Sequence, residues 1–127
     1  MDRLFCNILV DDVAGVAVFY ERVFGMQRHF DSDWFVILVH EGLPGHEYGI
    51  LKRNSEIVPE EARTEFGGCM VTFVVADCDA VFALAEAHGA QVLESPRLMP
   101  YGQVRALVRD PAGTLIDISS PAAGDAA

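Results

Sequence analysis

Residues 8–25, ILVDDVAGVAVFYERVFG, read as the end of a buried strand, an acidic turn, an amphipathic helix and a glycine stop. The chain repeats this plan at residues 73–89, FVVADCDAVFALAEAHG. The two copies are 65 positions apart, measured from Asp12 to Asp77. An internal repeat is the strongest guide to architecture that a single sequence offers. This one predicts two halves of similar structure.

The first half is predicted to contain four strands and one helix. Residues 4–10 are apolar almost throughout, as in a strand that is covered on both faces. Asp11 or Asp12 can cap the helix by accepting hydrogen bonds from its free N–H groups, and Gly25 can end it. The predicted buried stripe of the helix is Val13, Val16, Ala17, Tyr20 and Phe24. Further strands are predicted at residues 26–30, 34–40 and 48–52.

The second half is predicted to follow a polar linker at residues 54–68. A strand at 69–76 leads to a helix that is capped by Asp77 or Asp79 and ends at Gly89. Later strands are predicted at 91–94, 103–109 and 114–119, followed by a frayed tail at 121–127. Residues 110–113, DPAG, fit a type I turn. The helix is predicted to bury Val81, Leu84, Ala85 and His88.

These elements predict an α+β fold of two tandem βαβββ modules in one domain of residues 1–127. Module one spans about 4–53 and module two about 69–120. A single helix can cover only one face of a four-stranded sheet, so the other face needs a different cover. We expect a curved mixed sheet around a cleft, the kind of place where small ligands bind.

The composition argues against several classes of partner. The net charge of −10 and the pI of about 4.6 disfavour nucleic acid and anionic membranes, which both require a positive face. No run of about 18 apolar residues predicts a membrane span. The N-terminal residues do not resemble a signal peptide, and three sparse cysteines suit reduced thiols better than a disulfide framework. We therefore expect a cytoplasmic protein.

Three motifs give the chain a family resemblance: VDDV at residues 10–13, FYERVFG at 19–25 and RDPAGTLID at 109–117. With the paired modules, they resemble the vicinal oxygen chelate superfamily. This group includes glyoxalase I, extradiol dioxygenases, fosfomycin-resistance enzymes and bleomycin-resistance binding proteins. The resemblance covers residues 4–120 and implies a homodimer. It does not imply one activity, because function belongs to the site and not to the fold.

The resemblance also implies where a metal would be held. In metal-using members, an imidazole lies seven residues before the Asp that opens each helix, and here these positions are Phe5 and Met70. Neither side chain suits a divalent cation, since a thioether binds soft metals only. The carboxylate that follows the Asp-Pro turn by seven residues is Asp117. One ligand does not hold a metal, so we expect neither a metal nor another cofactor.

Strand alternation predicts the lining of the cleft. Inward-facing Phe5, Met70 and Asp117 imply inward-facing neighbours two positions away, and pairing Arg109 with Thr114 adds one face of residues 103–109. The lining is then mainly apolar and suits a small hydrophobic ligand, although the same side chains could fill a closed core. The predicted lining is Phe5, Asn7, Leu9, Met70, Thr72, Val74, Val104, Ala106, Val108, Leu115, Asp117 and Ser119.

Asp117 is the candidate catalytic residue. A carboxylate in such a wall can transfer a proton or bind a ligand amine, and the alternative is a structural hydrogen-bonded residue. Trp34, His40 and Tyr48 are candidate ligand contacts near the cleft mouth, with packing and ordinary hairpin roles as the alternative. Arg105 and Arg109 are interpreted as surface or sheet-edge residues, and binding of an anionic ligand is the less favoured interpretation.

Three functions remain open at this stage. The leading one is a metal-independent small-molecule binding protein of the bleomycin-resistance type. The alternative is a metal-dependent glyoxalase-like lyase or dioxygenase with an unrecognised ligand set. The third is an interaction protein with a filled cleft. The loss of both imidazoles, at Phe5 and Met70, favours the first.

Overall fold

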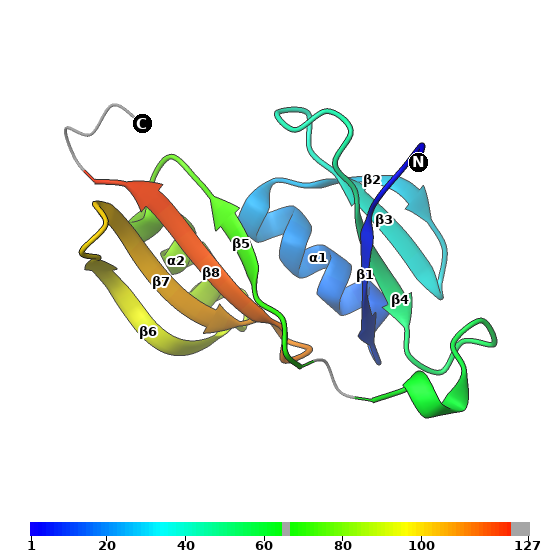
Figure 1. Cartoon of the computed structure of the whole chain (residues 1–127). Coiled ribbons are helices and arrows are strands. Elements are labelled where there is room, and N and C mark those ends of the chain that lie inside the picture. Colours follow the sequence, from blue (N-terminus) through cyan, green and yellow to red (C-terminus); the bar gives the residue numbers. More distant parts are fainter. Residues whose placement is uncertain (65–66, 123–127) are drawn as a thin grey trace. The chain divides into compact units, whose positions relative to one another are not determined.

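The computed structural model describes residues 1–64 and 67–122 (Figure 1). The chain divides into two compact units, unit 1 (Met1–Gly67) and unit 2 (Gly68–Ala127). Unit 1 contains β1 (Cys6–Val10), α1 (Val13–Phe24), β2 (Gln27–Asp31), β3 (Phe35–Val39), β4 (Tyr48–Lys52) and the short 3₁₀ helix η1 (Glu60–Ala62). Unit 2 contains β5 (Val71–Val74), α2 (Cys78–Ala87), β6 (Gln91–Leu98), β7 (Gln103–Arg109) and β8 (Leu115–Pro121).

Each unit has one four-stranded mixed sheet. The strand order is β1-β4-β3-β2 in unit 1 and β5-β8-β7-β6 in unit 2. The first and last strands of each unit pair in parallel, and the other neighbours are antiparallel. The predicted α+β class with two tandem βαβββ modules is confirmed. The two units share one topology because the sequence repeats one plan.

Helix α1 begins and ends where the sequence predicts. The Asp12 side chain accepts a hydrogen bond from the Gly15 N–H at 3.0 Å, and Gly25 ends the helix in the left-handed conformation, with φ of 67°. The predicted stripe is buried apart from Phe24, which is half-buried. Phe19 and Val23 are buried as well, so the buried face of α1 is wider than predicted.

Helix α2 is capped by Asp77, whose side chain accepts a hydrogen bond from the Ala80 N–H at 3.2 Å. Its buried residues are Cys78 and Ala85. The predicted burial of Leu84 and His88 is wrong, because both are exposed. Successive helical residues are turned by about 100°, so these two side chains share a flank beside Ala85 and not the sheet-facing stripe.

In both units the helix covers one face of its own sheet (Figure 1). The apolar core of each unit lies between that helix and that sheet. The strand residues of this core have no exposed surface, and each buried Leu, Ile or Val contributes roughly 1.5–3 kcal/mol. They are Ile8, Val10, Val36, Leu38 and Ile50 in unit 1, and Ala106, Val108, Ile116 and Ile118 in unit 2.

The turn between β7 and β8 forms as the residues 110–113 predict. The Gly113 N–H donates to the Asp110 carbonyl at 2.9 Å, and Gly113 has φ of 93°. The buried Asp110 carboxylate accepts from the N–H groups of Ala112 and Thr114 at 2.9 and 2.8 Å. Strand β8 continues to Pro121, two residues beyond its predicted end. Residues 65–66 of the predicted linker and 123–127 of the predicted tail lie outside the described residues.

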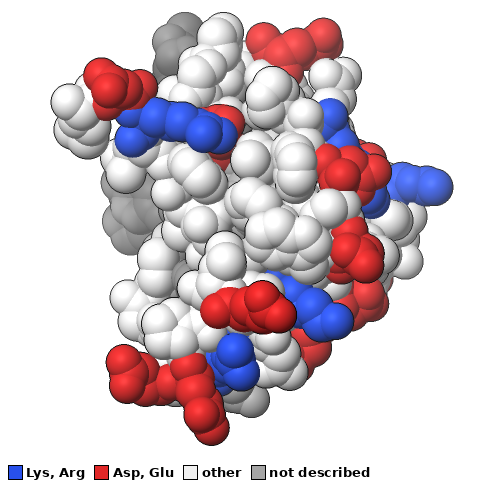
Figure 2. Space-filling view, turned by 90° about the vertical axis from the view of Figure 1, so that its right-hand side faces the viewer, with Lys and Arg blue, Asp and Glu red and all other residues white. Residues whose placement is uncertain are grey.

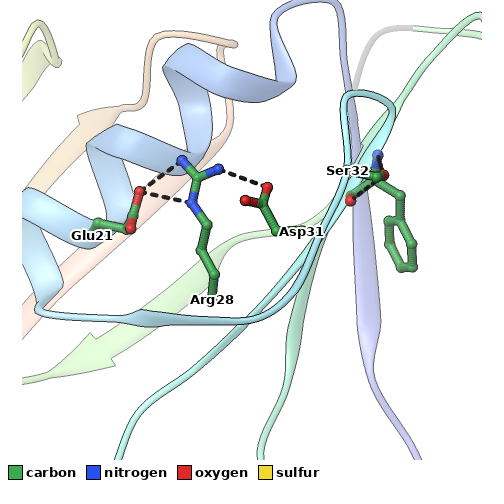
Figure 3. Close-up of polar contacts among 5 residues, drawn as sticks. Glu21, Arg28, Asp31 and Ser32 are labelled. Atoms are coloured by element: carbon green, nitrogen blue, oxygen red, sulfur yellow. Dashed lines mark hydrogen bonds and ion pairs between the residues drawn. The ribbon is translucent and has the colours of Figure 1, made fainter.

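Many basic side chains lie beside acidic ones. Arg28 donates to Glu21 on α1 from two nitrogens, at 2.9 and 3.1 Å, and to Asp31 at 2.9 Å (Figure 3). The nearby Ser32 hydroxyl donates to the Phe35 carbonyl at 2.7 Å and steadies the β2–β3 turn. Figure 2 shows the same mixing of basic and acidic side chains on one face.

Within the described residues no helix is long and apolar enough to cross a membrane.

Candidate functional site

The face of the unit 2 sheet that points away from α2 carries a group of polar side chains. Ser120 and Ile118 lie on the other side, since Cys78 of α2 donates its N–H to Ser120 Oγ at 3.1 Å and its thiol to the Ile118 carbonyl at 3.2 Å. Side chains alternate along a strand, so Asp117 and Ser119 lie on the opposite face. We call this the far face of unit 2. It includes Thr72, Val74, Gln91, Glu94, Arg97, Arg105, Leu107, Arg109, Leu115, Asp117 and Ser119.

Asp117 is the centre of a hydrogen-bonded triad. The Thr72 hydroxyl donates to Asp117 Oδ2 at 3.1 Å, and the Ser119 hydroxyl donates to Oδ1 at 2.7 Å. Asp117 and Ser119 are buried, whereas Thr72 is exposed. Each carboxylate oxygen retains further lone-pair capacity. The structure therefore brings three of the predicted site residues together around one fixed carboxylate.

The predicted placement of Val104, Ala106 and Val108 beside Asp117 is wrong. Arg109 pairs with Leu115 and not with Thr114. The Asp110 N–H donates to the Thr114 carbonyl, so Asp110 and not Arg109 lies opposite Thr114. A one-residue change of register moves every side chain to the other face. The three residues pair with Ser120, Ile118 and Ile116 on the helix side. Arg105, Leu107 and Arg109 take their place on the far face.

Arg105 belongs to a charged cluster on the far face. It lies opposite Ser119 on β8 and opposite Arg97 on β6. Its Nη2 is 3.4 Å from both carboxylate oxygens of Glu94, and Arg97 Nε donates to the same carboxylate. The hydrogen bond from Arg97, with a smaller contribution from Arg105, holds the pKa of Glu94 below its usual value despite some desolvation. Glu94 therefore stays ionised at neutral pH.

The corresponding face of unit 1 is more apolar. The paired positions Asn7 and Gly49 lie on the face away from α1. A Cβ atom on Gly49 would lie 1.9 Å from Asn7 Oδ1 and 3.2 Å from Phe35 Cε1. The Asn7 side chain therefore extends over Gly49 toward Phe35. The Phe5 ring is covered by the Arg3 guanidinium, 4.5 Å from the ring centroid, and Arg3 also pairs with Glu47.

Tyr48 does not lie on this face. Its side chain is buried on the helix side, where its hydroxyl donates to the Tyr20 hydroxyl of α1 at 3.0 Å. The two rings contact edge to face with centroids 4.9 Å apart. The predicted position of Tyr48 at a cleft mouth is wrong, because this pair makes Tyr48 part of the core.

The structure does not bring Trp34 and His40 together. They flank β3 at opposite ends, about 20 Å apart for an extended strand. The Trp34 ring is partly exposed and contacts Phe35, with centroids 5.6 Å apart. His40 accepts a hydrogen bond from the Gly42 N–H at 3.0 Å, as in an ordinary turn. Met70 is exposed and lies just before β5.

The described donors do not fit a metal ion. Within neither unit do three His, Cys, Asp or Glu side chains gather closely enough to hold one, over the residues that the structure describes. The Asp117 carboxylate accepts hydrogen bonds from two hydroxyls, of Thr72 and Ser119.

The sequence interpretation did not predict that Glu94, Arg97 and Arg105 share the far face with Asp117. A signal for Arg105 was present in residues 103–109, QVRALVR, and 115–119, LIDIS, which both alternate between apolar and polar positions except at Leu107 and Leu115. Matching the apolar positions places Val108 against Ile116 and Arg105 against Ser119. Glu94 and Arg97 had no comparable signal, since two irregularities in β6 change its register.

Two βαβββ units, each with a helix on one face of its sheet and candidate ligand contacts on the other, define a paired-module α+β protein of the glyoxalase type. A profile of the Glyoxalase/Bleomycin resistance protein/Dioxygenase superfamily matches residues 4–118. The chain belongs to this superfamily.

Two curated relatives share the name "Putative glyoxylase CFP32", from Mycobacterium bovis and Mycobacterium tuberculosis. Each is 30% identical over 135 residues, which include 94% of this chain and 44% of the relative. The chain thus spans less than half the length of these relatives.

Solved structures show the same fold. A family enzyme from Burkholderia phytofirmans has a TM-score of 0.79 and 22% identity, and the match covers 92% of this chain and 96% of that one. A glyoxalase-related enzyme from Fulvimarina pelagi has a TM-score of 0.77 and 19% identity, with 94% and 88% covered. At these identities the likeness concerns the fold alone.

Proposed function

We propose that this protein binds a small organic molecule without a metal ion, and that the far face of unit 2 supplies polar contacts to it. The observation that carries the proposal is the triad at Asp117. Two hydroxyl groups orient a buried carboxylate, and Leu107 and Leu115 give the same face apolar surface. A few fixed polar groups among apolar ones are typical of small-molecule sites.

The family resemblance supports the metal-independent form of the proposal. The positions that carry imidazoles in metal-using members are Phe5 and Met70, and Arg3 covers the Phe5 ring. The rival is a metal-dependent lyase or dioxygenase, and the name glyoxylase of the curated relatives is consistent with it. The two proposals differ in whether binding or turnover requires a divalent cation.

Within this proposal, Asp117 accepts a hydrogen bond or a proton from the ligand. Its orientation is fixed before the ligand arrives, so little conformational freedom is lost on binding. Whether the contact leads to a reaction depends on the ligand. An amine or hydroxyl group is the chemistry that a carboxylate acceptor recognises best.

The test begins with elemental analysis of protein purified without chelators and with melting curves in nickel, zinc, manganese and ferrous iron. A ligand that binds only the folded state raises the melting temperature. We expect no stoichiometric metal and no shift with any ion. Stoichiometric metal, or a shift that Asp117→Asn abolishes, would contradict metal independence and favour the rival enzyme.

A small-molecule screen by melting temperature, on chelator-treated protein, then tests binding itself. We expect compounds whose effect is unchanged by chelator and reduced in Asp117→Asn. Asp79→Asn is the matched control, because Asp79 is an exposed carboxylate in the same unit. Equal loss in both variants would contradict the role of Asp117 as a ligand contact. The absence of any compound that binds would point to an interaction protein with a filled cleft.

We also propose that the protein is a homodimer, as the family resemblance implies. A single small chain commonly forms such an assembly through a self-complementary interface. Light scattering should then give twice the chain mass of 13.9 kDa. A mass of one chain would contradict the proposal.

A further inference from the structure

We propose that Arg105 binds a carboxylate group of the small-molecule ligand on the far face of unit 2. The inference rests on the proposed function and adds the chemical class of the ligand. It comes from the position of Arg105, from the hydrogen bonds that its guanidinium makes and does not make, and from the charge of its neighbours.

The position of Arg105 places it next to the Asp117 triad. It is directly opposite Ser119, and Ser119 donates to Asp117 at 2.7 Å. Paired residues of neighbouring strands lie on the same face with Cβ atoms roughly 5 Å apart. A ligand that contacts Asp117 therefore lies within reach of the Arg105 side chain.

The guanidinium of Arg105 is poorly satisfied. Its side chain is 20% exposed, and its Nε atom is buried without a hydrogen-bond partner within the described part of the chain. Its contacts with Glu94 are long, at 3.4 Å. A guanidinium has five N–H donors in a fixed planar fork, and leaving a buried donor unsatisfied is unfavourable. A carboxylate can accept from two of these donors at once.

The charge of the neighbours also leaves Arg105 incompletely neutralised. Glu94 forms ion pairs with both Arg97 and Arg105, so one negative charge can neutralise only one of these two positive charges. Asp117 is the other nearby acid, and it already accepts hydrogen bonds from two hydroxyls. By contrast, Arg109 Nη1 donates to the Gly113 carbonyl at 3.0 Å in the turn. Arg105 is thus the far-face cation best suited to bind an anion.

The experiment uses four carboxylates and their primary amides as probes: benzoate, salicylate, mandelate and lactate against benzamide, salicylamide, mandelamide and lactamide. Each pair differs mainly in charge. Binding to the full chain is followed by ¹H–¹⁵N NMR, including the Arg105 Nε–H signal, which is identified by its absence in Arg105→Gln. We expect at least one acid to bind, to shift this signal, and to bind more tightly than its amide.

Three variants separate a ligand contact from a structural role. Arg105→Gln should weaken binding of that acid about tenfold, the size expected for a lost charged hydrogen bond. Arg105→Lys should give an intermediate loss, since lysine keeps the charge without the planar fork. The matched control is Arg97→Gln, which removes the other guanidinium on Glu94 and should change the affinity by less than about threefold.

Glu94→Gln provides the decisive comparison. If Arg105 binds the ligand, removing its acidic partner should leave the affinity unchanged or raise it. If the Arg105–Glu94 pair only maintains the structure, Glu94→Gln should weaken binding as Arg105→Gln does, and the inference is wrong. Acids that bind equally to wild type and Arg105→Gln, or no tighter than their amides, would also overturn it.

The failure of this inference is distinguishable from failure of the proposed function. Amides that bind to unit 2 when the acids do not would refute the role of Arg105 and leave a small-molecule site in place. If no probe of either kind binds, the carboxylate inference is wrong. The broader binding proposal is then decided by the melting-temperature screen alone.

Discussion

Thr72 and Asp117 lie directly opposite each other on the parallel strands β5 and β8, and the Thr72 hydroxyl donates to Asp117 Oδ2 at 3.1 Å. The second oxygen accepts from Ser119, which is two residues further along β8, at 2.7 Å. One residue on β8, Ser119, and one on β5, Thr72, therefore fix the carboxylate. Its orientation is a property of the parallel strand pair and needs no ligand.

The two hydroxyls should differ in their contribution to stability. Ser119→Ala removes a short buried hydrogen bond and should lower the free energy of unfolding by about 1–2 kcal/mol. Thr72→Val keeps the shape of an exposed side chain and should cost about 0.5 kcal/mol or less. Urea denaturation of both variants checks this order. An equal or reversed effect would contradict the assigned role of Ser119.

The composition of this site was only partly predictable from sequence. The family resemblance implies Asp117 and Met70 as site positions, strand alternation from these adds Ser119 and Thr72, and the structure brings Asp117, Ser119 and Thr72 together. The face of Arg105 was predicted wrongly because the predicted register pairs Arg109 with Thr114, whereas Arg109 pairs with Leu115 and the Asp110 N–H donates to the Thr114 carbonyl. One residue of error at the turn exchanges the two faces of the whole strand.

Gly49 should resist substitution because of Asn7. A Cβ atom there would lie 1.9 Å from Asn7 Oδ1, so Gly49→Ala forces Asn7 and its neighbours to move. Because Asn7 is exposed and its amide can rotate away, we expect a loss of about 1 kcal/mol or less in the free energy of unfolding, below the cost of overpacking a closed core. In an Asn7→Ala background the loss should be clearly smaller. A double-mutant cycle measures this coupling, and additive effects would show that Asn7 does not cause the restriction.

The hydroxyl pair of Tyr20 and Tyr48 should appear as a coupling between α1 and β4. Tyr48→Phe leaves the buried Tyr20 hydroxyl without this donor and should cost about 1 kcal/mol. Tyr20→Phe should cost a similar amount, and the double variant should cost less than the sum. Chemical denaturation gives these values. Wild-type stability in Tyr48→Phe, together with loss of ligand binding, would instead return Tyr48 to the list of ligand contacts.

The helix caps were predictable because they depend on local sequence alone. Asp12 and Asp77 each accept a backbone hydrogen bond in the first turn, at 3.0 and 3.2 Å. Asp12→Ala and Asp77→Ala should each lower the free energy of unfolding by about 1 kcal/mol. Asp11→Ala and Asp79→Ala are the matched controls, since neither side chain provides the observed cap. Larger losses in the controls would contradict the assignment of the caps.

The three cysteines should differ in reactivity. Cys6 and Cys69 are exposed, whereas Cys78 is buried at the start of α2. Labelling with a thiol reagent under native conditions should modify two thiols quickly and the third only after unfolding. Rapid modification of all three would show that α2 opens readily.

Cys78 should also make stability depend on alkaline pH. Burial, followed by the negative charge of Asp79, raises the pKa of this thiol above its usual value. Its contribution to stability is therefore complete below the unfolded pKa, about 8.5, and is lost as the pH rises through the higher folded pKa. Urea denaturation under reducing conditions should show that the free energy of unfolding falls as the pH rises above about 8.5. This fall should be smaller in Cys78→Ala. The exposed-thiol variants Cys6→Ala and Cys69→Ala should keep the wild-type fall, and a fall of equal size in Cys78→Ala would exclude the buried thiol as its source.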